Sequence, residues 1–396
     1  MSVRRAIAVF VVAVTLLGGC RATRDEGLPE PVRPRWTALE LPMPPGATGR
    51  LIVRDAVACE GRWYVVGAVG GADGTTRPAA WGSGDGRGWS PLSLRPISYY
   101  GERAILYAVG CHEGRIAVIG ARAGGAHGNP RVRTWRQDAD GALTEVPAEF
   151  ELYGGPEAVS ASRVAGGDRG WLIAGARTSG AAVWRSPDGD DFQLVAGAPG
   201  LASESILTTL ATDALAVPDG WLVGGGGRPA DRADRDPFVW FSGDARAWTR
   251  LALPATGADE IVQRLVRVGS VVYALGVRGS GFQAWVLDIA SGGVATSAGR
   301  WRAVGRFGTT GTGTVAGVES LAGGGGEVLA VTMAADGHRL WRAAAGGASW
   351  APVALPVSVS AGGDTSAALT LWDGGMVVTI DDGVAARVWF APLGAD

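Results

Sequence analysis

The chain alternates short apolar runs with glycine-rich and charged segments from residue 36 to its end. Apolar runs that end in glycine occur at "RWYVVG" (62–67), "RIAVIG" (115–120), "GWLIAG" (170–175), "GWLVGG" (220–225) and "VVYALG" (271–276). Short runs of β-branched, aromatic and aliphatic residues, bounded by glycine, aspartate and proline, are typical of β-strands. The pattern therefore predicts an all-β protein built from many short strands.

A second short run in each repeat ends in tryptophan. These tryptophans are Trp81, Trp135, Trp184, Trp240, Trp285, Trp341 and Trp389. The six intervals from Trp81 to Trp389 give a mean period of about 51 residues, which is the spacing of propeller blades. An upstream run such as 51–58 supplies a first strand, and a phrase such as "WSPLSL" supplies a fourth, half-exposed strand. The repeats predict a seven-bladed β-propeller of four-stranded blades over residues 36–396.

The phrase "WTALELP" (36–42) resembles the phrases that begin at Trp89, Trp248 and Trp350, each of which closes a repeat. The first copy closes no repeat, and the last repeat stops after the strand at Trp389 without a copy of its own. We therefore expect the strand 36–42 to pair with the strand that carries Trp389. This pairing would close the ring and remove an exposed sheet edge.

The turns between third and fourth strands share a pattern. They read "WGSGDGRGW" (81–89), "WRSPDGDDF" (184–192) and "WFSGDARAW" (240–248). An aspartate can accept backbone N–H bonds inside a tight turn, a serine can bridge the turn, and glycine readily adopts positive φ. The residues that form the pattern are Ser83, Asp85, Trp89, Ser186, Asp188, Phe192, Ser242, Asp244 and Trp248.

These turns resemble the Asp-box of the sialidase and BNR-repeat propellers. Three repeats match clearly; the match is shorter than the family pattern, and Ala245 stands where Gly86 and Gly189 stand in the other two. In that family the turns lie on the face away from the active site, and the aromatic residue is buried between sheets. The resemblance therefore implies a fold and gives almost no support for catalysis.

Sialidases need three arginines for the substrate carboxylate, a tyrosine nucleophile with a glutamate partner, and an aspartate acid. The early blade lacks the "RIP"-type phrase that carries the first arginine in that family. The loop "PISYYGER" (96–103) places Tyr99, Tyr100, Glu102 and Arg103 together, so these are weak catalytic candidates, although an ordinary rim loop has the same composition. A glycosidase also needs two carboxylates facing the central pocket. The pool for that pair is Glu102, Glu157, Glu204, Asp259 and Glu260.

The first twenty residues, "MSVRRAIAVFVVAVTLLGGC", have the order of an export signal. Two arginines precede an apolar core from Ala6 to Leu17, which is too short to span a bilayer as a helix. The end of this segment resembles the lipobox of bacterial lipoproteins, in which the cysteine receives a diacylglyceryl group and the chain is cut before it. The resemblance implies a signal peptide over 1–19, lipidation at Cys20 and an extracytoplasmic protein held on the cell membrane. An ordinary secretory signal and an uncleaved anchor helix are the alternatives.

Residues 20–35 place three prolines among alternating charges, which predicts an extended, flexible, lipid-anchored tether. In the whole chain, 64 of 396 residues are glycine without a collagen period, in agreement with many tight turns. The net charge of −2 provides no basic field for nucleic acid. All 36 basic residues are arginine, and the abundance of alanine and glycine favours codon bias over selection for anion recognition.

Histidine and cysteine positions bear on metal and redox sites. His112, His127 and His338 are too few and too scattered for a zinc cluster, so we predict neither a metal nor a cofactor. Cys59 and Cys111 hold matching positions at the ends of first strands in consecutive repeats. In an oxidising compartment they are expected either to form an inter-blade disulfide or to remain two free thiols.

One face of a propeller collects the loops between blades and the loops between second and third strands. The most charged of these loops lies within 226–237 and alternates three arginines with three aspartates, as either a solvated, self-neutralising loop or a rim that docks a partner. Two functions follow. The first is a binding or scaffold lipoprotein that engages protein partners or cell-envelope glycans through this face without catalysis. The second is a sialidase-like, Asp-box-type glycoside hydrolase that acts on envelope or extracellular glycans.

Overall fold

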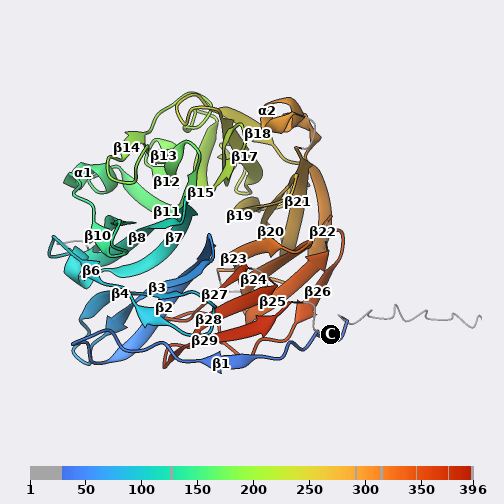
Figure 1. The fold of residues 1–396 in the computed structure, drawn as a ribbon. Coiled ribbons are helices and arrows are strands. Elements are labelled where there is room, and N and C mark those ends of the chain that lie inside the picture. The colour runs from blue at the N-terminus through green and yellow to red at the C-terminus, as the bar shows by residue number, and fades with distance from the viewer. Residues whose placement is uncertain are drawn as a thin grey trace, which may run out of the picture.

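Seven antiparallel sheets are arranged as blades around a central axis in the computed structural model of the protein (Figure 1). The structure describes residues 29–124, 128–289, 292–312, 315–344, 346–372 and 374–393. Each blade has four antiparallel strands, and one blade carries an additional short strand at its outer edge. The predicted seven-bladed all-β propeller is therefore confirmed.

The strands of each blade are given from the axis outward. Blade 1 contains β2 (Arg50–Cys59), β3 (Arg62–Gly70), β4 (Thr76–Ser83) and β5 (Ser90–Pro91), and blade 2 contains β7 (Ile105–His112), β8 (Arg115–Gly124), β9 (Asn129–Gln137), β10 (Leu143–Glu145) and the extra strand β6 (Leu94–Arg95). Blade 3 contains β11 (Ala158–Gly167), β12 (Gly170–Arg177), β13 (Gly180–Ser186) and β14 (Gln193–Val195), and blade 4 contains β15 (Leu207–Val217), β16 (Gly220–Pro229), β17 (Asp236–Ser242) and β18 (Thr249–Ala252). Blade 5 contains β19 (Glu260–Val268), β20 (Val271–Arg278), β21 (Gly281–Asp288) and β22 (Arg302–Phe307), and blade 6 contains β23 (Gly317–Gly324), β24 (Glu327–Ala334), β25 (Gly337–Ala344) and β26 (Trp350–Val353). Blade 7 contains β27 (Ser366–Trp372), β28 (Gly375–Asp381), β29 (Ala386–Pro392) and β1 (Thr37–Leu39). The short helices are η1 (Gly101–Arg103), α1 (Phe150–Tyr153), α2 (Gly293–Ser297) and η2 (Ala298–Arg300).

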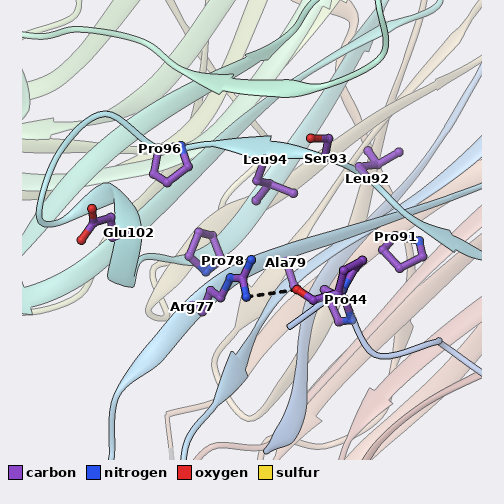
Figure 2. Close-up of a pocket in the computed structure, with 11 residues that line it drawn as sticks. Pro44, Arg77, Pro78, Ala79, Pro91, Leu92, Ser93, Leu94, Pro96 and Glu102 are labelled. Atoms are coloured by element: carbon purple, nitrogen blue, oxygen red, sulfur yellow. Dashed lines mark hydrogen bonds between the residues drawn. The ribbon is translucent and has the colours of Figure 1, made fainter. Parts of the chain in front are cut away.

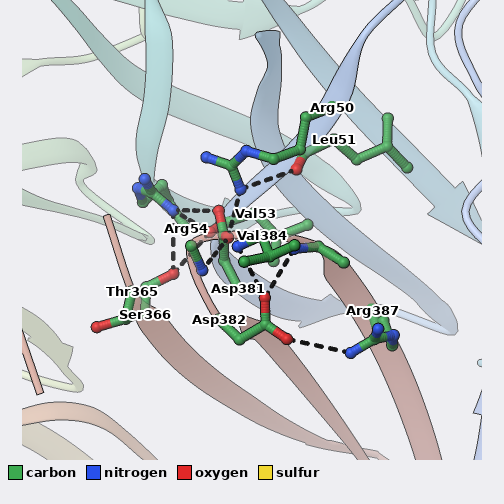
Figure 3. Close-up of polar contacts among 12 residues, drawn as sticks. Arg50, Leu51, Val53, Arg54, Thr365, Ser366, Asp381, Asp382, Val384 and Arg387 are labelled. Atoms are coloured by element: carbon green, nitrogen blue, oxygen red, sulfur yellow. Dashed lines mark hydrogen bonds and ion pairs between the residues drawn. The ribbon is translucent and has the colours of Figure 1, made fainter. Parts of the chain in front are cut away.

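The N-terminal strand closes the ring, as the repeat pattern predicted. Ala38 of β1 pairs with Trp389 of β29 in antiparallel register, and Figure 1 shows β1 beside β29. Polar contacts between blades 1 and 7 reinforce this closure (Figure 3). Asp381, whose side chain is fully buried, accepts Arg50 Nη1 at 2.5 Å and Arg54 Nη1 at 2.8 Å. The two ends of the chain are thus joined by backbone bonds and by a buried ion-pair cluster.

The outer strands are shorter than the sequence suggested, because the chain leaves one blade to run along the next. Pro91 pairs with Trp81 and Leu92 N donates to the Ala80 carbonyl of blade 1 at 2.8 Å; the chain then crosses to blade 2, where Leu94 pairs in parallel with Leu143. The segment before β1 also runs along a neighbouring blade, since Val32 forms a parallel bridge with Val353 of blade 6. The last residues of the predicted tether therefore lie along the outer edge of blade 6.

The repeated tryptophans occupy the same place in every blade and are buried between sheets. They are Trp81, Trp135, Trp184, Trp240, Trp285, Trp341 and Trp389. Trp81 Nε1 donates to the Pro42 carbonyl at 2.8 Å, and Trp240 Nε1 donates to the Gly200 carbonyl at 2.7 Å. Both carbonyls belong to the connection that enters the tryptophan's own blade. The tryptophan thus fixes the connecting segment as well as filling the core.

The turns after the third strands have the hydrogen bonds that their sequence favours. Asp85 Oδ1 accepts the N–H groups of Arg87 and Gly88, both at 2.8 Å, and the Ser83 hydroxyl lies 3.0 Å from the same oxygen. Equivalent bonds surround Asp188 and Asp244. The aromatic residues after these turns are Trp89, Phe192 and Trp248, and all three are buried. The serine and aspartate side chains therefore form hydrogen bonds within the turns, and the aromatic side chains pack in the core.

Cys59 and Cys111 form a disulfide between blades 1 and 2. Each cysteine lies where an inner strand reaches its hairpin, and their Cα atoms are 5.5 Å apart. The bond joins positions 52 residues apart in the sequence. Neighbouring inner strands therefore approach closely enough for a disulfide at this end of the ring.

Candidate functional site

The two faces of the ring differ in the segments that form them. We call the face made by the connections between blades and by the loops between second and third strands the loop face. Its segments contact one another: Ser203 N donates to the Ser179 carbonyl at 2.8 Å, and Thr310 N donates to the Ser280 carbonyl at 2.9 Å. The opposite face, which we call the hairpin face, consists of the turns that follow the first and third strands. This separation places all inter-blade connections on one surface.

Large apolar side chains are exposed almost exclusively on the loop face. Among the described residues, nine such side chains are exposed, and eight of them lie on this face. The eight are Met43, Ile97, Tyr99, Phe150, Val159, Ile206, Val315 and Val384. The ninth, Trp372, lies at the hairpin of blade 7. Isolated exposed apolar residues are common on soluble proteins, but here most of them lie on one of the two faces.

The candidate residues of the predicted loop 96–103 contact one another. Tyr99 is 63% exposed, and the Arg103 guanidinium stacks on its ring at 4.0 Å. Glu102 Oε2 lies 3.0 Å from Arg103 Nη1, so the carboxylate is occupied by an ion pair. Tyr100 lies edge-on to Tyr99 at 5.3 Å. The loop presents an aromatic surface rather than a tyrosine positioned against a free carboxylate.

A buried glutamate that sequence analysis missed holds this loop in place. Glu145 Oε2 accepts the N–H groups of Ile97 and Ser98 at 2.7 and 3.0 Å, and Arg133 Nε lies 3.2 Å from Glu145 Oε1. Glu145 belongs to β10, the outer strand of blade 2. A single glutamate in an otherwise apolar "ALTEV" run was the only signal for this role.

A proline-rich cavity of about 510 Å³ lies at the loop face beside this loop (Figure 2). It separates the start of β4 from the crossover segment 91–96. Its lining includes Pro44, Pro45, Pro78, Pro91 and Pro96, with Arg77 and Glu102 as the charged members. Arg77 Nη1 donates to the Pro45 carbonyl at 3.3 Å. The prolines give the cavity rigid walls without backbone donors.

A second cavity of about 550 Å³ opens between blades 2 and 3 on the same face. Its lining is mainly apolar and aromatic and includes Tyr107, Val132, Phe150, Tyr153, Pro156 and Val159. Burial raises the pKa of both Tyr107 and Tyr153, so both phenols stay protonated at neutral pH. Arg131 is the charged residue of this cavity. The combination of an apolar wall and one cation is characteristic of a ligand pocket.

Ion pairs engage part of the charged loop in 226–237. Arg232 pairs with Asp236, four residues on, and Arg235 Nη2 pairs with Asp259 Oδ2 at 2.5 Å. The contact with Arg235 holds the pKa of Asp259 below its usual range, because the guanidinium stabilises the carboxylate. The other charged residues of the loop, Arg228, Asp231 and Asp234, are exposed to solvent.

The carboxylates expected to face a central pocket lie elsewhere. Glu260 is buried at the start of β19, where its Oε2 accepts Arg278 Nε at 2.9 Å. Glu204 pairs with Arg250 at the surface. Glu102, Glu157, Glu204, Asp259 and Glu260 are all absent from the described lining of the central cavity. Glu260 is directed into its own sheet toward Arg278.

The inner strands carry a feature that sequence analysis also missed, a β-bulge repeated in six blades. The extra residues are Arg54, Tyr107, Ser162, Thr212, Gln263 and Glu319. The Tyr107 hydroxyl donates to the Ala161 carbonyl of the next blade at 2.6 Å. Gln263 Oε1 accepts the Val318 N–H, again from the next blade, at 2.8 Å. The bulges thus direct polar side chains across the gaps between blades.

The residues that follow the bulges place charges at the axis. Arg163 Nη1 donates to Asp55 Oδ2 at 2.6 Å, and Arg163 Nη2 donates to the Glu319 carbonyl at 2.7 Å. Arg264 Nε donates to the same carbonyl at 2.9 Å. Asp213 Oδ2 accepts the N–H of the residue after Arg264 at 2.8 Å. The signal for this cluster was visible as single charges inside the apolar runs "LIVRDAVA", "ASRVA", "LATDALAV" and "IVQRLV".

This cluster forms one end of a central cavity of about 280 Å³. The cavity extends from the bulges toward the hairpin ends of the inner strands, where Leu321, Leu371 and Trp372 line it. Burial and the nearby charge of Arg163 lower the pKa of Arg264 to about 10, so Arg264 remains a cation at neutral pH. Asp55 and Arg163 form an ion pair, and the bonds of Arg163, Asp213 and Arg264 to backbone groups join different blades around the axis. The arrangement is that of a structural network at the axis.

Other site types find no support in the part of the chain that the structure describes. Within those ranges, no group of three or more histidine, cysteine, aspartate or glutamate side chains is placed to hold a metal ion. A search of the same residues finds no helix long and apolar enough to cross a membrane. His127, Cys20 and the signal segment 1–19 lie outside the described residues.

Comparison with known proteins identifies the fold. No family model matches the chain, and no curated relative was found. The chain is similar to the β-propeller domain of Cps50 (Swd1) from Myceliophteria thermophila, at 11% identity and a TM-score of 0.53, with 90% of this chain and 99% of that chain covered. It is also similar to a Mycobacterium tuberculosis puromycin-hydrolyzing peptidase, at 12% identity and a TM-score of 0.53, with 87% of this chain and 52% of that chain covered. A Trypanosoma rangeli sialidase in complex with DANA aligns at 12% identity and a TM-score of 0.46, covering 91% of this chain and 60% of that chain. At these identities the likeness concerns the propeller fold alone.

Proposed function

We propose that this protein is a binding propeller, held on the outer side of a bacterial membrane by a lipid on Cys20. It engages a protein partner or a cell-envelope glycan through its loop face and catalyses no reaction. The observation that carries this proposal is the concentration of exposed apolar side chains on the loop face. Aromatic residues and methionine are enriched at protein interfaces, and Tyr99, Phe150 and Met43 are among the exposed residues of this face.

The path of the tether supports a fixed position near the membrane. Val32 is bonded to blade 6 through Val32 N to the Pro352 carbonyl and Ala354 N to the Val32 carbonyl. Trp36 Nε1 also donates to the Ala354 carbonyl at 2.9 Å. Val32 lies twelve positions after Cys20, and twelve fully extended residue steps span about 40 Å. A lipid at Cys20 would therefore keep the ring close to the membrane surface, with its side, not its loop face, tied to the anchor.

A glycoside hydrolase of the Asp-box type remains the second hypothesis, with less support. It rests on the resemblance of three turns, whose aspartates and serines are occupied by turn hydrogen bonds. Among the candidate carboxylates, Glu260 and Asp259 are each bound by an arginine. A pair of free carboxylates at glycosidase spacing would be needed for this reaction.

The proposal is tested by crosslinking in cells and recovery of the full-length protein. The loop-face variant combines Ile97→Ser, Tyr99→Ser, Ile206→Ser and Val384→Ser, and Trp372→Ser on the hairpin face is the control. We expect at least one partner to be recovered with the wild type and the control and to be lost from the loop-face variant. A partner retained by the loop-face variant, or lost with the control, would contradict the proposal. Activity of the wild type on envelope glycans, abolished by a carboxylate variant, would establish the hydrolase instead.

A further inference from the structure

Three arginines, Arg122, Arg131 and Arg133, lie at the loop-face ends of the adjacent strands β8 and β9 of blade 2, and only Arg131 lacks a polar partner among the described residues. Arg122 Nη2 donates to the Gly74 carbonyl at 3.1 Å, and Arg133 lies against the carboxylate of Glu145. Arg131, which is paired with Arg122 in the sheet register, has neither a hydrogen bond nor an ion pair to any described residue. Its Nε is buried without a partner. A buried donor without an acceptor costs free energy, so the position is one that a ligand can improve.

Aromatic rings hold the Arg131 guanidinium in the cavity between blades 2 and 3. Its central carbon lies 4.7 Å from the centroid of the Phe150 ring and 5.8 Å from that of Tyr100. Stacking on aromatic rings fixes the plane of the guanidinium and leaves its edge for hydrogen bonding. A planar guanidinium edge matches the geometry of a carboxylate, which it binds through two parallel bonds.

The rest of the cavity selects an apolar group. Val132, Pro156, Val159 and the ring of Phe150 line it, and Asn129 and Ser160 are its uncharged polar members beside the two tyrosines. The hydroxyls of Tyr107 and Tyr153 are directed away, to the Ala161 carbonyl and to Thr134. The volume of about 550 Å³ lies within the range of small-ligand pockets. The glutamates on the neighbouring segment, Glu149, Glu151 and Glu157, do not line the cavity and are solvent-exposed, where their charge is screened.

We propose that this cavity binds a carboxylate carried on an apolar or aromatic group, with Arg131 as the carboxylate ligand and Phe150 as the platform for its guanidinium. The carboxylate can belong to a free organic acid or to the C-terminal residue of a peptide, since both present the same chemistry. This inference extends the proposed function by naming a ligand class for one place on the loop face. The inference rests on the proposed function for its biological role. Its binding test is independent of the crosslinking test, because the residues replaced in the crosslinking variant do not line this cavity.

Calorimetric titration of the full-length protein tests the inference with matched acids and amides. The probes are phenylacetate against phenylacetamide, for a free acid, and N-acetylphenylalanine against its C-terminal amide, for a peptide end. We expect saturable binding of at least one acid in roughly the millimolar range, as such small ligands allow, and binding of its amide weaker by about ten- to a hundredfold. The acid that binds more tightly identifies the source of the carboxylate.

Two variants assign the binding to this cavity. Arg131→Met keeps an unbranched apolar stem but removes the guanidinium and its donors, so it should weaken acid binding by tenfold or more and leave the amide unchanged. Arg246→Met, at an exposed arginine on the hairpin face, should bind as the wild type does, and Phe150→Ala should weaken binding with Arg131 in place. Equal binding of acid and amide, absence of binding by both acids, or unchanged acid binding in Arg131→Met would overturn the inference. A partner lost in crosslinking while Arg131→Met binds normally would refute this site and leave the proposed function standing.

Discussion

Replacement of Asp381 by asparagine tests how the ring is held closed. Asp381 is fully buried, and its carboxylate accepts Arg50 and Arg54 from blade 1 as well as the Gly383 N–H (Figure 3). The asparagine amide would retain an oxygen for one donor but would leave two guanidinium groups without an anion. Loss of one member of a buried ion pair typically costs about 3–5 kcal/mol. The arginine side chains are 26% and 18% exposed, so water recovers part of this loss, and we expect about 2–4 kcal/mol.

The measurement is urea unfolding of the full-length protein, with Asp382→Asn as the matched control. Asp382 is the next residue; it bonds the N–H groups of Val384 and Ala385 and pairs with Arg387 near the surface. Asparagine preserves those turn bonds, so the control should lose less than about 1 kcal/mol. With a slope of about 3 kcal/mol per M, the Asp381 variant should lower the midpoint by about 1 M. Equal midpoints for the two variants would refute the assignment of Asp381 to ring closure.

Three further predictions concern stability. Reduction of the Cys59–Cys111 bond, or a double serine variant, should lower the free energy of unfolding by about 4 kcal/mol, because the bond closes a loop of 52 residues. An unfolding midpoint that does not change when a reductant is added would contradict this prediction. Burial lowers the pKa of His338, but its contact with Glu319 Oε2 at 2.9 Å and its bonds to backbone carbonyls raise it more, so the net pKa lies above 6.5. The free energy of unfolding should therefore fall as pH rises through that raised pKa. Urea unfolding of a His338→Gln variant should show no such pH-dependent step. The turn N–H groups hold the pKa of Asp244 below its usual range, so the contribution of this carboxylate to the free energy of unfolding should be lost as pH falls below about 4. Asp244→Ala should lower the free energy of unfolding by about 1 kcal/mol at neutral pH and make it depend less on pH in acid.

The architecture was predictable because it repeats. A strand pattern seen once is ambiguous, but seven tryptophans at a near-constant spacing specify blades, and the unmatched phrase at 36–42 specified which strands meet. Strand lengths were less predictable. The sequence around Pro91 looked like one outer strand, whereas the chain bonds to blade 1 as far as Leu92 and then continues along blade 2.

The candidate site was harder to predict because side-chain direction depends on single-residue shifts. The bulges reverse the alternation within the inner strands, and this places Arg163 and Arg264 at the axis together with Asp55 and Asp213. Glu260 looked equally well placed in the sequence, yet it faces Arg278 inside a sheet. The sequence did not distinguish Arg131 from its neighbours. Arg122 and Arg133 each find a polar partner in the fold and Arg131 does not, and this difference becomes visible only in the structure.

The central claim, that the loop face is the binding surface, is tested most directly by a photo-crosslinking amino acid introduced at single positions in cells. Ile206 and Val384 report on the loop face, and Trp372 reports on the hairpin face. The account predicts a crosslinked species at Ile206 or Val384 that is absent at Trp372. The same species at all three positions, or at Trp372 alone, would contradict the claim.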